Sequence, residues 1–401
     1  YLLFCAQVVD RPVTSWDGTM PSVAILIDGA PSAFLILAWG TTLAVAGAIL
    51  VLFIPVVRLG GLRPTLRFPS GVGRQALHLL TTHWVGLMVA QLAIIVVILL
   101  ANAKGAPGTL NVLQYSVAAQ VLTYAFLIIP LFRKITLPSR DVRGERGELP
   151  ESIRGATPQR ARLNREAGGA ASPSSNSVTA GSSQQARPAR NVGVRIRALA
   201  ATATITAGLL IASARAVEAL FAAVDVGDVT GMAGAVTWLA PGLVAFALAA
   251  HLSRILFWVG RSRAVVSATV IGAVVVVATS VVLVTIVPTG EGPATLRGLA
   301  LSTSIGLFAT AALLLHTAQI ALGPNAVAGL SQTLTVAAGS ATFSAIAGRL
   351  LTERFLAGNP GVGTVIVAGL AGCIVVLSIS LAALRVGDPY VSHTLGCSNW
   401  R

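Results

Sequence analysis

The feature that most constrains this chain is a series of apolar blocks, each about 20 to 30 residues long, separated by short polar stretches. Blocks of this length cross a hydrocarbon layer of about 30 Å as α-helices. Hydrophobic residues make up 55% of the chain and charged residues only 10%, against about 25% charged in soluble domains. The blocks do not alternate polar and apolar residues as the strands of a membrane β-barrel do. The sequence therefore predicts an all-α polytopic membrane protein.

The apolar blocks predict about nine transmembrane helices, at 32–57, 77–101, 110–132, 198–222, 232–257, 264–288, 296–321, 326–349 and 361–385. The basic residues support this count, because Lys and Arg collect in cytoplasmic loops. Loops on one side hold 22 of them, while the other side holds Arg11, Lys104, Arg297, Arg349 and Arg354. The net charge of +14 thus marks membrane topology and gives no reason to expect a nucleic-acid partner. We expect a multi-pass protein with a cytoplasmic C-terminus.

The stretch 135–196 is the one long loop between predicted spans. Its middle, AGGAASPSSNSVTAGSSQQARPAR, is rich in Ser, Gly, Ala and Pro and lacks apolar periodicity, which predicts disorder. Its basic flanks have two interpretations: they bind anionic lipid, or they are a solvated linker that follows the topology rule. A loop of this kind also offers a place where other proteins can dock.

Two segments carry a resemblance to a known family. The first is THWVGLMVAQLAIIVVILLANAKGAPGTLNVLQYSVAAQVLTYAFLIIPLF at 82–132, with a glutamine in the helix (Gln91), glycines in a short loop and an LQY entry to the next helix. The second is WLAPGLVAFALAAHLSRILFWVGRSRAVVSATVIG at 238–272, with Pro241 and Gly242 followed by Arg254 and Phe257. Both resemble the MurJ/MviN lipid II flippases, in their actinobacterial form, within the MOP transporter superfamily.

The resemblance implies a fold and a division of the chain. The family has fourteen helices, and this chain would supply the sixth to the fourteenth, apparently lacking the first five apart from the end of the fifth. Residues 1–75 would then close the N-terminal lobe, residues 76–321 would form the C-terminal six-helix lobe with its disordered loop 135–196, and residues 322–401 would form two groove helices and a short tail.

The resemblance also implies a function. Such proteins carry lipid II, a lipid-linked peptidoglycan precursor, from the inner to the outer leaflet of the bacterial plasma membrane by alternating access. The expected partners are this substrate, membrane lipids and, through the loop, cell-wall synthesis proteins; no cofactor and no enzyme activity are implied. The family places an arginine three residues after the tyrosine of its eighth helix, whereas here Tyr115 is followed at that spacing by Ala118. A phosphate contact must come from elsewhere.

Arg215 and Glu218 are the charged pair inside the predicted span 198–222. A spacing of three puts both on one helix face, where they can pair. An ionisable residue inside a span usually faces a cavity or a partner, and Arg215 would then offer a phosphate-binding fork. The alternative is that Arg215 extends to the membrane interface from the outer third of the span. The sequence leaves both open.

The remaining candidates for substrate contact are Arg254, Gln91, Gln114 and Gln120. Arg254 ends its span on the cytoplasmic side, where it either anchors the helix or captures a lipid diphosphate. The three glutamines line a hydrophilic cavity or hydrogen-bond neighbouring helices. Small residues in AGSATFSAIAG at 338–348 permit close helix packing, and in a groove helix they also leave room for a lipid chain.

Other kinds of site are disfavoured. His78 and His83 are five residues apart with no ligand beside them, which argues against a metal site, and no GxSxG or HExxH is present. Two further functions stay open. One is an exporter of the same superfamily with another cargo, a drug or a polyprenyl-linked saccharide. The other is a non-transporting scaffold that recruits partners through its basic loop.

Overall fold

A computed structural model describes part of residues 39–53 and residues 72–130, 177–223, 229–323, 327–358 and 361–387. Nearly all of these residues are helical and none of them lies in a strand. The chain divides into two compact units, Tyr1–Gln75 and Ala76–Arg401. In the first unit, described residues between 39 and 53 are helical and exposed. The second unit holds the helical bundle considered below.

Eight helices of the described residues are long and apolar enough to cross a membrane. The fold is therefore that of an all-α polytopic membrane protein. The elements are α4 (Val72–Lys104), α5 (Thr109–Thr123) with its π-helical continuation η1 (Tyr124–Ile128), α10 (Ser177–Ala223), α11 (Met232–Trp258), α12 (Ser262–Thr285), α13 (Gly292–Leu322), α14 (Leu330–Leu356) and α15 (Val362–Gly387).

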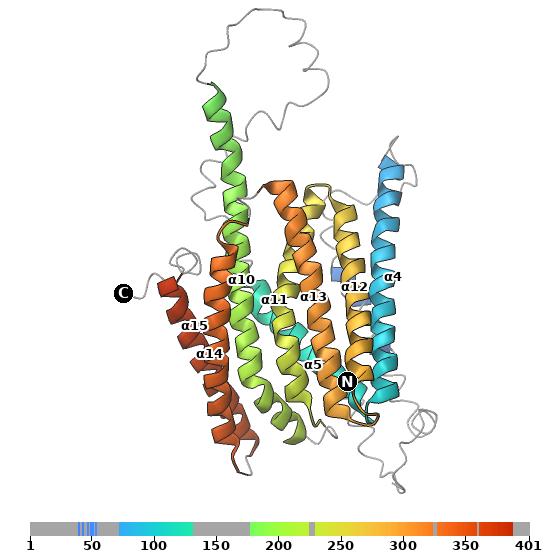
Figure 1. Cartoon of the computed structure of the whole chain (residues 1–401), viewed down its shortest axis with the longest axis vertical. Helices are drawn as coiled ribbons and strands as arrows, with labels where there is room; N and C mark the ends of the chain where they lie inside the picture. The colour runs from blue at the N-terminus through green and yellow to red at the C-terminus, as the bar shows by residue number, and fades with distance from the viewer. Residues whose placement is uncertain are drawn as a thin grey trace, which may run out of the picture. The chain divides into compact units, whose positions relative to one another are not determined.

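The helices form a row in which α15, α14, α10, α11, α13, α12 and α4 follow one another, with α5 behind α11 (Figure 1). From α15 to α12 consecutive members of the row pack together, and α5 contacts α10, α11 and α13. Helix α4 meets α12 where Gly86 lies against Val266. Helix α11 is the central helix, because both neighbours in the row and α5 cover it.

The core of the bundle follows from the sequence of α11. Its leucines Leu239, Leu243, Leu252 and Leu256 are fully buried, and their spacing of four places successive pairs on one face. Alanines fill much of the rest of the helix surface, so neighbouring backbones approach closely. Lipid tails are as apolar as leucine, so this packing stabilises the bundle through van der Waals contact and hydrogen bonds rather than through removal from water.

The contact between α10, α14 and α15 is built on glycine and on buried hydroxyl groups. A Cβ atom added at Gly348 would lie 2.8 Å from the carbonyl oxygen of Gly372. The hydroxyl of Thr352 donates to Gly348 at 2.9 Å and lies 3.3–3.4 Å from carbonyls of α15 and α10. Gly348 ends the small-residue segment 338–348, which at this position serves close packing.

Two expectations from the sequence need comment. The predicted span 32–57 lies mostly outside the described residues. The predicted disordered loop 135–196 is not disordered throughout, because α10 begins at Ser177. Ala, Gln and Arg residues between 180 and 197 favour helix, and extending an existing helix adds one hydrogen bond for each residue fixed. Residues 135–176 lie outside the described part. The three-part division of the chain stays a prediction.

Candidate functional site: an arginine-lined pocket

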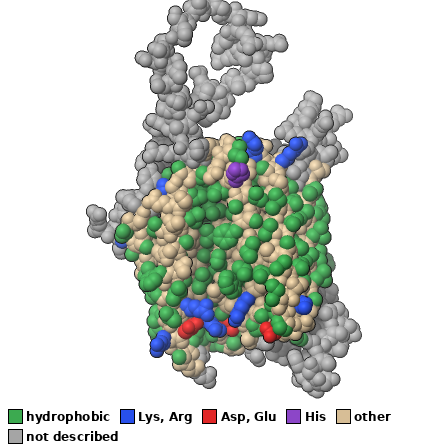
Figure 2. Space-filling view, in the orientation of Figure 1, with side chains coloured by type: hydrophobic (Ala, Val, Ile, Leu, Met, Phe, Trp, Pro, Cys, Tyr) green, Lys and Arg blue, Asp and Glu red, His purple; other side chains and the backbone are tan. Residues whose placement is uncertain are grey.

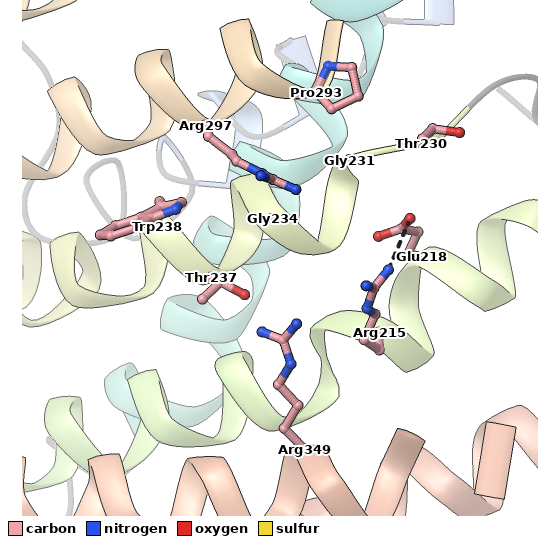
Figure 3. Close-up of a pocket in the computed structure, with 10 residues that line it drawn as sticks. All are labelled: Arg215, Glu218, Thr230, Gly231, Gly234, Thr237, Trp238, Pro293, Arg297 and Arg349. Carbon is pink, nitrogen blue, oxygen red and sulfur yellow. Dashed lines mark ion pairs between the residues drawn. The ribbon is translucent and has the colours of Figure 1, made fainter. Parts of the chain in front are cut away.

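A pocket of about 570 Å³ lies among α10, α11, α13 and α14. We call it the arginine pocket, because three of its walls carry an arginine (Figure 3). Arg215 comes from α10, Arg297 from α13 and Arg349 from α14. The lining is completed by Glu218, Thr230, Gly231, Gly234, Thr237, Trp238 and Pro293.

The pocket lies near one end of the bundle. Arg297 is five residues into α13, Trp238 six residues into α11, and Arg349 seven residues from the end of α14, which places them about 8 to 10 Å along their helices at 1.5 Å per residue. Figure 2 shows the charged side chains on this face gathered near the two ends, with an uncharged zone between them.

Two of the three arginines are in ion pairs with carboxylates. Arg215 lies 3.7 Å from Glu218 and 3.9 Å from Glu353, and Arg349 lies 3.0 Å from Glu353. These contacts link α10 to α14. Glu218 also accepts a hydrogen bond of 2.6 Å from the backbone N–H of Ala233. Its carboxylate therefore caps the N-terminus of α11, where the helix dipole favours negative charge.

Arg297 differs from the other two. Among the described residues it has no ion pair and no side-chain hydrogen bond, and its side chain lies across Gly234 of α11, where a Cβ atom would be 2.9 Å from its Nε atom. Glycine at 234 thus permits this arginine to reach the pocket. The guanidinium groups of Arg297 and Arg349 point into the same space (Figure 3).

A proline within the central helix α11 lies close to the pocket. Pro241 is inside α11 and has no N–H, so the carbonyl four residues earlier loses its usual donor. Side chains from two other helices donate to the carbonyls next to it: Ser304 of α13 to Trp238 at 2.6 Å, and Gln120 of α5 to Leu239 at 3.0 Å. Donors from neighbouring helices make a proline tolerable within a membrane span.

Gly242 completes this arrangement, because a Cβ atom there would lie 2.6 Å from the hydroxyl oxygen of Ser304 and 3.1 Å from its Cα atom. We call Pro241, Gly242, Gln120 and Ser304 the Pro241 node. It joins α5, α11 and α13. Helix α5 is itself irregular nearby, since it continues as the π-helix η1 from Tyr124. Tyr124 packs edge-on against Phe246 of α11, with ring centroids 4.9 Å apart.

The structure separates the predicted substrate-contact residues into four places. Arg215 and Glu218 line the arginine pocket, so Arg215 faces a cavity, although its side chain is also 47% exposed. Gln120 is buried in its hydrogen bond to α11, one of the two interpretations open from the sequence. Gln91 and Gln114 are exposed on α4 and α5, neither of which contributes to the pocket.

Arg254 occupies the fourth of these places. It is exposed four residues before the end of α11, sixteen residues beyond Trp238, which corresponds to about 24 Å along the helix. Arg254 and Arg215 therefore do not contact one ligand group together in this structure. Their roles in binding substrate stay predictions.

Sequence reasoning assigned Arg297 and Arg349 no role beyond the count of basic residues on the outer side. The predicted spans began and ended close to them, at 296 and 349. In the structure α13 begins at Gly292 and α14 continues to Leu356, which places both arginines inside helices. The one sequence signal for them was that each arginine lies at the edge of an apolar run. Only the packing of the helices places them around the same pocket as Arg215.

Comparisons with family models, with curated proteins and with solved structures found no match to this chain.

Proposed function

We propose that this chain belongs to a membrane transporter that moves a lipid-linked precursor from the inner to the outer leaflet of a bacterial plasma membrane. The proposal takes its cargo, lipid II, from the resemblance to the MurJ/MviN flippases. The eight membrane-crossing helices are compatible with it. No catalytic role is proposed.

The observation that carries the proposal is the Pro241 node in the central helix. Alternating access requires helices that exchange between two arrangements, and transporters often use interrupted helices at the centre of the membrane. In α11 the carbonyls of the turn before Pro241 accept side-chain hydrogen bonds from α5 and α13. Such bonds can exchange partners as the helix bends, without leaving a carbonyl unsatisfied in lipid.

The neighbouring π-helix supports the same conclusion. A π-turn within an α-helix is rare and frequent at functional sites, and η1 contacts both α10 and α11. The two irregular elements thus lie together in the bundle. A scaffold without moving parts gains nothing from them, which favours transport over the scaffold alternative.

The test is transport itself. The full-length natural protein is reconstituted into liposomes that contain a fluorescent lipid-linked diphosphate sugar, and the fraction that reaches the opposite leaflet is followed over time. Flipping of this lipid, but not of a fluorescent phospholipid, would support the assignment. Movement of a cationic drug in place of the lipid would favour the other exporter class. No movement of either cargo would leave the scaffold function.

The role of the node is tested by Pro241→Ala, which restores a backbone N–H to α11. We expect flipping to slow several-fold while the protein retains its stability, because the helix becomes straighter and stiffer. Pro107→Ala is the control, since Pro107 is exposed in the turn between α4 and α5 and lies outside both the node and the pocket. Equal flipping rates for the two variants would refute a role for the node.

A further inference from the structure

The three arginines of the arginine pocket are not equivalent. Arg215 is held between two carboxylates, and Arg349 shares one of them. Arg297 has no carboxylate within salt-bridge distance among the described residues. Three guanidinium groups thus face the two carboxylates of Glu218 and Glu353, which leaves one positive charge in excess. Arg297 is exposed within this open pocket, so its guanidinium group is accessible to an anionic group that enters from the end of the bundle.

The helix ends around the pocket add to its positive potential. The N-terminus of α11, at Thr230 and Gly231, and that of α13, at Pro293, both lie in the lining. Each helix N-terminus carries a partial positive charge. Glu218 caps the first of them. At the second, the N-cap residue Glu291 makes no side-chain capping hydrogen bond and is outside the pocket lining, so the N–H groups of the first turn of α13 have no side-chain acceptor from it.

Trp238 adds an apolar ring to the lining of the pocket. Trp238 is 44% exposed and lies at the opposite side of the pocket from Arg215 in Figure 3. Tryptophan is enriched where a membrane meets water, because its ring accepts both apolar and polar neighbours. A ligand with a phosphate group at one end and a hydrocarbon chain at the other fits this combination. An inorganic ion would use the charged part only.

We propose that the arginine pocket binds the phosphodiester group of a membrane phospholipid in the outer leaflet, with Arg297 and Arg349 as its ligands. Arg215 is a positioning residue, which Glu218 and Glu353 hold in place. A phosphodiester carries one negative charge and matches the single excess positive charge, whereas a diphosphate carries more. Because no residue of α4 or α5 lines the pocket, the site is separate from the exposed glutamines of those helices. The inference goes beyond the proposed function and does not depend on transport.

The experiment measures lipid binding to the full chain by native mass spectrometry in detergent, after removal of co-purified lipid. Phosphatidylglycerol supplies the phosphodiester, and diacylglycerol with the same chains supplies the tails alone. We expect bound phosphatidylglycerol and no retained diacylglycerol. Equal binding of the two lipids would overturn the proposal, because the phosphate would then contribute nothing.

Arg297→Gln carries the test, since this arginine has no ion pair to lose. We expect phosphatidylglycerol to bind about fivefold more weakly or worse, as for loss of one charge-assisted hydrogen bond at a partly exposed site. Arg349→Gln should also weaken binding, and its melting temperature is measured because its ion pair with Glu353 is lost as well. Arg354→Gln is the matched control: Arg354 is on the same helix as Arg349, is exposed and is outside the pocket. Unchanged binding by Arg297→Gln would refute the site.

Two further ligands identify the source of the phosphate. Inorganic phosphate should fail to displace phosphatidylglycerol at millimolar concentration; displacement would show a free-anion site and contradict a lipid ligand. An isoprenoid diphosphate should bind Arg297→Gln and the unchanged chain equally; preferential loss in the variant would assign the pocket to the transported lipid instead. Because binding is measured without transport, a chain that binds but does not flip would refute only the proposed function.

Discussion

Replacing Gly234 by alanine tests how Arg297 is held, because it moves this side chain without removing its charge. A Cβ atom at position 234 would lie 2.9 Å from the Nε atom of Arg297 and 3.3 Å from its Cγ atom. Non-bonded carbon and nitrogen atoms prefer a separation of about 3.5 Å or more. The Nε atom must therefore move by about 0.5 Å, and the guanidinium group beyond it moves with it.

The size of the effect on binding follows from hydrogen-bond geometry. Good N–H···O bonds span only about 2.7 to 3.2 Å between heavy atoms, so a shift of this size weakens the contact between Arg297 and a phosphate. A partial loss of one charge-assisted bond corresponds to about 1 kcal/mol, or about fivefold weaker binding of phosphatidylglycerol. The assay is the native mass spectrometry titration described above.

The folded state should not suffer from the same substitution. Gly234 is the third residue of α11, and alanine is a better helix former than glycine by up to about 1 kcal/mol. The atom that the new Cβ meets belongs to a flexible side chain that can move away. We therefore expect the melting temperature in detergent to stay equal or rise while lipid binding falls.

The matched control is Gly339→Ala in α14, where a Cβ atom would have nothing within 4 Å. This variant should leave binding unchanged, and its stability should stay equal or rise through helix propensity alone. The reasoning fails if Gly234→Ala binds phosphatidylglycerol as tightly as the unchanged chain. It also fails if the melting temperature of Gly234→Ala falls, because the loss of binding would then report unfolding.

Three other substitutions have effects that the structure predicts, each read as the free energy of unfolding in a denaturing detergent titration. Gly348→Ala should destabilise by about 1–3 kcal/mol through overpacking, because its Cβ atom would meet a backbone carbonyl at 2.8 Å; a value as small as that of Gly339→Ala would contradict close packing there. Gln120→Leu should cost about 1 kcal/mol through loss of its 3.0 Å hydrogen bond to α11, whereas the exposed Gln114→Leu should cost nothing. A larger loss of stability for Gln114→Leu than for Gln120→Leu would refute the stabilising role of the Gln120 hydrogen bond. Glu218→Gln should cost about 0.5–1 kcal/mol, since it keeps an acceptor for the end of α11 but loses the charge; equal stability would show that the capping is not electrostatic.

Much of the fold was predictable from the sequence because length and composition decide it. The spans at 232–257 and 264–288 agree with α11 and α12 to within three residues. Helix ends were less certain: α10 begins 21 residues before the predicted span, because charged and polar residues extend a helix beyond the apolar part as readily as they form a loop. Hydropathy detects what lies in lipid and not where a helix stops.

The candidate site was predictable only in part. The cost of charge in a span singled out Arg215 and Glu218, and both line the pocket. The same reasoning counted Arg297 and Arg349 with the basic residues of the loops, since they lie at the very ends of the predicted spans 296–321 and 326–349. Gln120 was a candidate for substrate contact, but its bond to the carbonyl of Leu239 depends on the contact between α5 and α11, which no local pattern encodes.

The sequence by itself determined the class of protein and the approximate spans, because both depend on composition within a window of residues. The tertiary structure alone decided which faces of the helices meet. These helices are apolar on nearly every side, and in lipid an apolar face has no preference for the protein interior. Their rotation is therefore set by glycine contacts, buried hydroxyls and the Pro241 node. That rotation brings arginines from α10, α13 and α14 around one pocket.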